Sequence, residues 1–501
     1  MSQLPQGWSR VLLEDIADVL DFEREPINSS ERESRINGKN ESDLYPYYGA
    51  TGQVGLIDSF RSEGQRVLLG EDAAPFLDPV KDKAYLANGR FWVNNHAHVL
   101  AGACGLINNE FLCYQLNTVD YQPFVTGSTR LKLTSSAMKQ IPMVAAPAAE
   151  QTRIVTKLEE LLSDLDAGVA ELKTAQKKLG QYRQSLLKAA VEGALTAEWR
   201  THNTPTETGA QLLQRILLER RTRWEAKRLA KFAEQGKKPP KDWQKKYPEP
   251  VQPDTSDLPE LPEGWVWASV EQLTEFVTSG SRGWAEYYAN SGATFIRSQN
   301  INKDWLDMSD IAFVNPPTGS EGARTRVQEN DVLLTITGAN VGKTARVEIQ
   351  LTEAYVSQHV ALIRPVDSSF AEFLHLFLTA EFGGRGQLNQ LAYGAGKPGL
   401  NLQQVGAVFI PLPGLLEMRA LLAAISTQWT AIAENETAIA TALKQSTAQR
   451  QNILRAAFAG ELVPQDPNDE PASVLLERIR VERAEREATK KPRGRKTKEQ
   501  Y

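Results

Sequence analysis

Apolar residues recur every three or four positions in two long stretches of the chain. In the first stretch a leucine returns every seventh residue, and in the second an isoleucine keeps the same interval, with Ser446 as a polar gap. This spacing is typical of helices that bury one narrow stripe against a partner helix. The predicted seam residues are Leu158, Leu165, Leu172, Leu179 and Leu186 in the first helix, and Ile425, Ile432, Ile439 and Ile453 in the second.

Both predicted helices end at a glycine, Gly193 or Gly460, a residue at which helices often stop. About 40 residues at 1.5 Å each make a helix roughly 60 Å long. Such a stripe can also pack on its own domain or form a homodimer. Because two stripes of equal length occur in one chain, we expect them to pair with each other as an antiparallel coiled coil.

The segments that precede the helices have a different pattern. Residues 9–143 and 266–412 contain short runs of β-branched and aromatic residues separated by turns, such as RFWVNNHAHVL at 90–100 and TFIRSQNI at 294–301. Helical pieces such as Phe370–Thr379 intervene. We therefore predict the α+β class, with two domains that have mixed, mostly antiparallel sheets.

Three sequence blocks occur twice, in the same order. LPQGW at 4–8 returns as LPEGW at 261–265, RQSLLKAAVEGAL at 183–195 as RQNILRAAFAGEL at 450–462, and LLQRILLER at 212–220 as LLERIRVER at 475–483. Matched blocks in the same order, each pair about half the chain apart, indicate an internal duplication with a pseudo-two-fold repeat. The predicted domains are 1–143, a first sheet domain; 144–199, a first helix; 200–263, a charged linker with a helix; 264–413, a second sheet domain; 414–463, a second helix; and 464–501, a C-terminal helix and basic tail.

Charge is unevenly distributed along the chain. The 501 residues carry a formal net charge of -5, which argues against a general polyanion binder. Residues 215–246 nevertheless hold twelve Lys and Arg against four acids. We interpret 215–250 as a long charged insertion between the halves, and the helix predicted at 210–231 as either a contact with a partner subunit or a solvated face. Two cysteines exclude a disulfide scaffold, and no apolar run reaches the roughly 18 residues of a membrane span, so we expect a soluble, cytoplasmic protein.

Two short segments resemble catalytic motifs but differ from them in spacing or residue type. GANVGKT at 338–344 is one residue short of a Walker A loop, and NPPT at 315–318 lacks the aromatic residue of adenine methyltransferases. We read the first as a hairpin turn. The five histidines form no metal-binding pattern. We expect no catalytic centre, no bound cofactor and no metal on this chain.

Each sheet domain closes on a glycine turn, a basic residue and an Ile-Pro step: VTGSTRLKLTSSAMKQIPM at 125–143 and YGAGKPGLNLQQVGAVFIPLP at 393–413. Open backbone NH groups and cations suit phosphate, while Asn, Gln, Arg and Lys suit base edges. Such loops are also ordinary turns, and the face of His96 and His98 could be core, a metal edge or a base-reading edge. The DNA-binding candidates are Asn94, His96, Ser128, Arg130 and Lys132, then Arg297, Gln299, Asn300, Lys343, Lys397 and Asn401.

The two-copy plan, the RQxxLxxAxxGxL helix endings and the tail GELVPQDPNDEPASVLLERIRVER resemble specificity (S) subunits of type I restriction-modification systems, in particular the K-12-like (type IA) branch. The resemblance implies two target recognition domains, each reading half of a bipartite asymmetric DNA site. It implies spacer helices that set the gap. It also implies two methyltransferase (M) subunits that methylate adenine N6 with AdoMet, and two restriction (R) subunits that use ATP and Mg²⁺ for translocation and cleavage.

Two other functions fit the residues. A stand-alone bipartite DNA-binding adaptor would share the duplication but bind without a methyltransferase. A coiled-coil scaffold for protein interaction would show no salt-dependent affinity for DNA.

Overall fold

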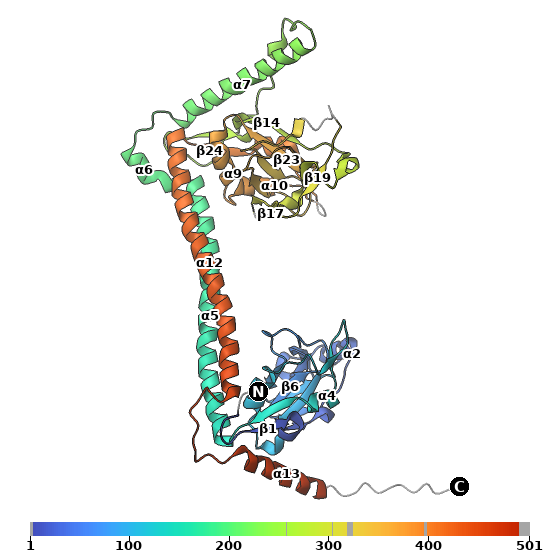
Figure 1. The fold of residues 1–501 in the computed structure, drawn as a ribbon. Coiled ribbons are helices and arrows are strands. Elements are labelled where there is room, and N and C mark those ends of the chain that lie inside the picture. Colours follow the sequence, from blue (N-terminus) through green and yellow to red (C-terminus); the bar gives the residue numbers. More distant parts are fainter. Residues whose placement is uncertain (1–3, 257, 303, 318–323, 395–397, 490–501) are drawn as a thin grey trace, which may run out of the picture. The chain divides into compact units, whose positions relative to one another are not determined.

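A computed structural model describes residues 4–256, 258–302, 304–317, 324–394 and 398–489. The chain divides into two compact units (Figure 1). The first unit contains the residues up to Thr174 and those from Ile439 onwards, and the second contains Ala175–Ala438. Each unit thus combines one sheet-rich segment with parts of both long helices.

The first unit is built on two four-stranded sheets. One has the order β2-β9-β6-β7 and is antiparallel throughout; the other has the order β4-β3-β8-β5 and contains one parallel pair, β3 with β8. A β1–β12 pair and a β10–β11 hairpin complete it. Its elements are β1 (Ser9–Leu12), α1 (Leu13–Ile16), β2 (Ala17–Val19), α2 (Ser29–Ile36), β3 (Tyr45–Gly49), β4 (Gly52–Ile57), β5 (Ser62–Glu63), β6 (Arg66–Gly70), β7 (Ala84–Ala87), β8 (Arg90–Val93), β9 (Ala97–Gly102), α3 (Asn109–Leu116), β10 (Val125–Thr126), β11 (Lys132–Leu133), α4 (Ser135–Lys139), β12 (Pro142–Ala145) and α13 (Ala472–Thr489).

The second unit repeats this plan, with sheets β14-β23-β20-β21 and β15-β19-β16-β22 and a pair β13–β24. Its parallel pair is β16 with β22. Its elements are α6 (Ala197–His202), α7 (Gly209–Glu234), β13 (Val266–Ser269), α8 (Val270–Leu273), β14 (Thr274–Ser279), β15 (Tyr288–Ala289), β16 (Ala293–Ile296), β17 (Ile301–Asn302), β18 (Trp305–Leu306), β19 (Ala312–Val314), β20 (Val332–Thr335), β21 (Thr344–Arg346), β22 (Ala354–Val356), β23 (Val360–Pro365), α9 (Ala371–Thr379), α10 (Gly384–Leu391), α11 (Leu402–Ala407) and β24 (Phe409–Leu412). The predicted α+β fold with mostly antiparallel sheets is confirmed.

Two predicted strands are interrupted by turns. The run 90–100 is two strands, β8 and β9, because the chain turns at 94–96. In the run 294–301, β16 ends at Ile296, Ser298–Asn300 form a 3₁₀ turn, and β17 begins at Ile301. Apolar periodicity does not detect either break, since polar residues occur at alternate positions of half-buried strands as well. The predicted hairpin at GANVGKT is confirmed, because it joins β20 to the antiparallel β21.

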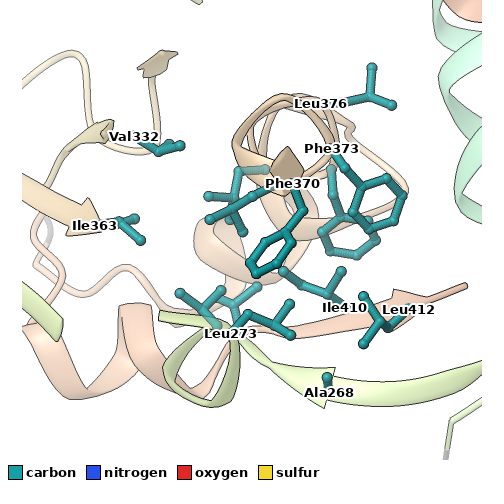
Figure 2. Close-up of a cluster of buried hydrophobic side chains, with 14 of the residues drawn as sticks. Ala268, Leu273, Val332, Ile363, Phe370, Phe373, Leu376, Ile410 and Leu412 are labelled. Carbon is teal, nitrogen blue, oxygen red and sulfur yellow. The ribbon is translucent and has the colours of Figure 1, made fainter. Parts of the chain in front are cut away.

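The core of each unit lies where helices cover the antiparallel sheet. All four residues of β20 are buried, as expected for a strand with both faces covered. In the second unit, Phe370 and Phe373 at the start of α9 pack in one cluster with Leu273, Ile410 and Leu412 (Figure 2). Burial of one such side chain stabilises the fold by about 1.5–3 kcal/mol.

The two long helices, α5 (Ala148–Val191) and α12 (Leu415–Ala459), run antiparallel. In the first unit, Leu158 near the start of α5 packs in one cluster with Ala457 near the end of α12. In the second unit, Leu187 near the end of α5 packs with Leu421 and Ile425 near the start of α12. In each unit, the start of one helix therefore lies beside the end of the other, as two antiparallel helices require.

The predicted seam residues face inward to different degrees. Leu158, Leu186, Ile425, Ile432 and Ile439 are buried, whereas Leu165, Leu172, Leu179 and Ile453 are half-buried. Paired long helices with small residues beside the seam leave such a stripe partly accessible. Ion pairs flank it within each unit, Arg450 with Asp166 in the first and Arg183 with Glu436 in the second.

Helices α7 and α13 occupy equivalent places. The amide of Ala472 donates to the carbonyl of Gly7 at 2.8 Å in the first unit, and the amide of Gly209 donates to the carbonyl of Gly264 at 2.7 Å in the second. Their inward residues are buried in the respective cores: Leu475 and Ile479, and Leu212 and Ile216. The interpretation of 215–250 as a pure insertion is therefore wrong for its first part, because the segment through Arg220 repeats α13.

The remainder of that segment forms a basic arm of the second unit, residues 221–247. Trp224 stacks on Trp243 with ring centroids 5.9 Å apart, and Arg220 donates to the Tyr247 hydroxyl at 2.6 Å. The arm begins beside Thr274, whose carbonyl accepts from Arg220 Nε, and so lies at the opposite end of β14 from Ser279. Its lysines, including Lys237 and Lys238, are exposed.

Candidate nucleic-acid interface

The candidate residues of the first unit converge at one end of its antiparallel sheet. Here β6 ends, β9 begins and the β10–β11 hairpin crosses the gap between them. An isolated antiparallel β-bridge pairs Asp72 with Lys132, and the amide of Leu133 donates to the carbonyl of Glu71 at 2.7 Å. We call this region, Glu71, Asp72, residues 94–96 and residues 128–132, the polar end of the first unit.

The turn 94–96 is shaped by a buried amide. Asn94 is 8% exposed, and its side-chain oxygen accepts a hydrogen bond from the amide of His96 at 2.8 Å. Asn94 therefore fixes the turn, while Asn95 and His96 stand outward, exposed and half-buried respectively. Of the two predicted residues in this turn, His96 is the one whose ring reaches the surface.

Two carboxylates hold the cations of the polar end. Asp72 Oδ1 lies 2.7 Å from His96 Nδ1 and accepts from Arg130 Nη2 at 3.0 Å. Glu71 accepts from Lys132 Nζ at 3.1 Å and also pairs with Arg24. Burial raises the pKa of Glu71, but the hydrogen bonds from Arg24 and Lys132 outweigh it and hold that pKa below its ordinary 4.5. The carboxylates keep Arg130 and Lys132 in defined positions.

His98 belongs to the core, which resolves one alternative left open by the sequence. Its ring is fully buried, with Nδ1 2.8 Å from Asp21 Oδ2 and Nε2 3.0 Å from the carbonyl of Leu133. Burial raises the pKa of Asp21, whereas its hydrogen bond with His98 lowers that pKa, and the net direction is downward from 3.8. Among the described residues no group of His, Cys, Asp and Glu could hold a metal ion.

The tip of the β10–β11 hairpin carries Ser128. This residue is exposed, and it follows Gly127, whose φ of 98° lies in the left-handed region. A Cβ at Gly127 would lie 2.5 Å from the carbonyl oxygen of Arg130, so the tight turn requires glycine. Ser128 and Arg130 are thereby presented on one exposed loop.

Three candidates of the second unit gather around Asp310. Arg297 Nη2 donates to Asp310 Oδ2 at 3.2 Å, and Gln299 Nε2 donates to the same atom at 2.8 Å. Asn300 is 3% exposed and donates to the backbone carbonyl of Asp310 at 2.8 Å. Arg297 and Gln299 reach the surface, whereas Asn300 shapes the turn.

The other candidates of the second unit lie on neighbouring loops. Lys343 is half-buried in the β20–β21 turn, which Asn340 ties to the carbonyl of Ser298 at 3.3 Å. Asn401 caps α11, accepting from the amide of Gln404 at 2.8 Å. Lys397 lies outside the described residues.

Sequence reasoning missed the acidic members of the polar end. Glu71 and Asp72 were not singled out because carboxylates repel phosphate, and their value here comes only from the cations that they hold. Nothing in the local pattern EDAAP signals that role, since its partners lie 24 and 58 residues away from Asp72. Within the described part of the chain, no helix is long and apolar enough to cross a membrane.

The structure thus defines a protein with two modules of one topology, each with polar loops beside its antiparallel sheet. The family model "Type I restriction modification DNA specificity domain" matches residues 5–175. A putative type I restriction enzyme specificity subunit of Haemophilus influenzae, S.HindORF215P, is 36% identical over 149 residues, which cover 30% of this chain and 36% of that protein.

A full-length match supports the same family. The EcoDI specificity subunit of Escherichia coli is 21% identical over 501 residues, 96% of each chain. A solved structure that concerns complex assembly of the type I R-M system matches this chain with a TM-score of 0.60 at 17% sequence identity. The match covers 92% of this chain and all of that chain, so the two share a fold. Residues 5–175 match the model of this family, and the findings together support a type I restriction-modification specificity subunit. These matches do not separate the K-12-like branch, which stays a prediction.

Proposed function

We propose that each unit reads one half of a bipartite, asymmetric double-stranded DNA site, and that α5 and α12 set the spacing between the halves. The observation that carries this proposal is the duplication of the polar end. Both units have the same sheet topology and carry polar side chains on loops beside it, at 94–96 and 128–132 in the first unit and at 297–300 and 343 in the second. Two readers on one chain suit two short sequences separated by bases that need no contact.

Contacts at the polar end divide by chemistry. Arg130, Lys132 and Ser128 bind phosphate oxygens and position the unit, since charged and hydroxyl groups recognise the backbone whatever the sequence. His96 and, in the second unit, Gln299 and Arg297 face base edges in the major groove. Asp72 and Glu71 hold the cations in place before DNA arrives, which reduces the entropy lost on binding.

The chemistry of modification and cleavage resides on partners. The chain itself provides no catalytic centre and binds no cofactor. Two methyltransferase (M) subunits bring AdoMet for N6-adenine methylation, and two restriction (R) subunits bring ATP and Mg²⁺ for translocation and cleavage. The complex acts in the cytoplasm, where its DNA substrate lies.

The proposal is tested by replacing residues 9–143 with the corresponding segment of another family member. Methylated adenines are then mapped across the DNA of cells that carry the native or the chimeric chain. One half of the modified site should change while the other half and the spacing stay fixed. Change in both halves, or methylation at a single uninterrupted motif, would contradict modular half-site reading.

A further inference from the structure

We propose that Gln358 and His359 read base edges of an A·T pair in the second half-site, in the position that Asn95 and His96 occupy in the first. This inference rests on the proposed function, because it assigns specificity to residues of the same recognition surface. The two residues follow β22 within the segment SQHVALIRP. No local motif marks them, and only the structural equivalence of the two units does so.

The backbone of the two turns is equivalent bond by bond. In the first unit the parallel pair β3–β8 ends where the amide of Asn94 donates to the carbonyl of Tyr48 at 3.0 Å; in the second, the amide of Ser357 donates to the carbonyl of Ile296 at 2.9 Å. The backbone amide of Glu71 then donates to the carbonyl of His96 at 2.8 Å, and the backbone amide of Ile336 donates to the carbonyl of His359 at 2.9 Å. His359 therefore occupies the place of His96.

The turns are also stabilised in the same way. The side-chain oxygen of Asn94 accepts from the amide of His96 at 2.8 Å, and the hydroxyl of Ser357 accepts from the amide of His359 at 3.4 Å. A short polar side chain that caps the amide two residues on is a recurrent turn device. Both turns thus present their next two side chains outward.

The side chains of Gln358 and His359 are available to a ligand. Both are exposed, and Gln358 Nε2 lies 3.2 Å from His359 Nε2. Where Asp72 holds His96, the equivalent residue Thr337 offers no carboxylate, and in the described chain no acid lies within ion-pair distance of His359. The second turn is therefore not occupied by internal ion pairs.

The surroundings favour an A·T pair. Beside the turn is a hollow of about 190 Å³, whose walls include Trp284, Tyr288 and Phe295. The amide of Gln358 carries a donor and an acceptor, which match N6 and N7 of adenine, and an apolar wall suits the methyl group of thymine. Tyr288 is 50% exposed, so this wall reaches the surface.

The test uses the full-length chain purified with whatever subunits it binds, and DNA pools in which each half-site is randomised in turn. We expect Q358A to lower the preference for the native base at one or two positions of one half-site by about 10- to 100-fold. H359A should lower the preference in the same half-site. The matched control is Q350A, because Gln350 is an exposed glutamine in the β21–β22 loop, at the other end of β21. Q350A should leave the base preference of both half-sites unchanged.

The variant Q358E tests whether misfolding, rather than the loss of a base contact, explains a loss of preference in Q358A. Glutamate only accepts hydrogen bonds, so the preferred base should shift toward cytosine, whose N4 donates. A shifted preference requires a folded protein. Unchanged preference in Q358A and H359A, a loss in both halves, or a uniform loss of affinity would overturn the assignment. If the native complex selects no sequence in either half, the proposed function itself fails.

Discussion

The two units are alike inside and different at their polar ends. Leu69 and Leu334 occupy the same register position, one residue before the strand end that faces the turn, and both are fully buried. A few residues further on, Glu71, Asp72 and Lys132 in the first unit correspond to Ile336, Thr337 and Gly399 in the second, as the matching bridges show. The sheet end of the first unit is therefore ion-paired, whereas the equivalent positions of the second unit carry no charged side chains.

The difference shows where each part of the chain is constrained. Buried strands must fill one kind of core, so duplication keeps their volume and register. Loops at the sheet end contribute little to the core and are free to carry new chemistry. The proposed reading of two half-sites that differ in sequence would require this division, with one scaffold and two surfaces.

The largest loss of stability is expected from substitutions in the cores, which are alike in the two units. Leu69→Ala and Leu334→Ala each remove a fully buried side chain and should each lower the free energy of unfolding by about 2–5 kcal/mol. Denaturant titration with hydrogen exchange of peptides from each unit measures both. The exposed Val54→Ala serves as control. A loss at one site several times that at the other would break the equivalence of the two cores.

A smaller effect, with a pH signature, is expected at the first polar end. Glu71→Gln removes the carboxylate that pairs with both Arg24 and Lys132 and should cost about 1–3 kcal/mol at neutral pH. The folded-state pKa of Glu71 lies below 4.5, so the ionised group stabilises the fold above that pH and the contribution is lost as pH falls below it.

Unfolding measured from pH 6 down to about pH 3 therefore separates the variants. The native protein should lose stability more steeply than Glu71→Gln, and peptides of the first unit should report the loss. Glu63→Gln, at an exposed acid of the same unit, should keep the native slope. Parallel profiles for the native protein and Glu71→Gln would mean that the ion pairs do not couple to folding.

The interior was largely predictable from sequence and the polar ends were not. The heptads of α5 and α12, the repeated blocks and strands such as Arg66–Gly70 follow from periodicity, because a buried stripe leaves a regular apolar pattern. The turn at Asn94 has no such pattern. Its polar residues alternate as those of a half-buried strand do, and only the hydrogen bond from His96 to Asn94 reveals the bend.

Candidate residues divide in the same way. Arg130 and Lys132 were predicted from a glycine turn with basic residues, which is a local signal. Asp72 is identified only through its contacts with His96 and Arg130, and His359 only through its equivalence to His96, so residue type and spacing could not predict them. Asn300 and Asn401 have the residue type of base readers, yet their amides hold a turn and cap a helix.

Removal of one exposed cation should change DNA binding rather than stability. Arg130→Ala should weaken binding about tenfold and lower the slope of log affinity against log salt by about 1, as expected for one phosphate contact. Lys397→Ala tests the second unit in the same way. Titration of labelled DNA at several salt concentrations measures both quantities.

The control for Arg130 is Arg90→Ala. Arg90 is also exposed and ion-paired, with Glu63, but it stands at the start of β8, away from the turn at 94–96. Its loss should leave affinity and slope unchanged. If Arg130→Ala and Arg90→Ala behaved alike, the polar end would not be the DNA-binding end.

The smallest effect is expected on the helix pair, where the two units agree again. Arg183 and Arg450 begin the repeated RQ blocks, and each pairs with an acid on the opposite helix, Glu436 at 3.3 Å and Asp166. These pairs are exposed, so Arg183→Gln and Arg450→Gln should each cost about 0–1 kcal/mol, less at high salt. Equal small losses in denaturant titrations at low and high salt would confine the divergence of the two units to their polar ends. A large loss at one arginine alone would show that the helix pair has diverged too, because an exposed ion pair by itself cannot supply that energy.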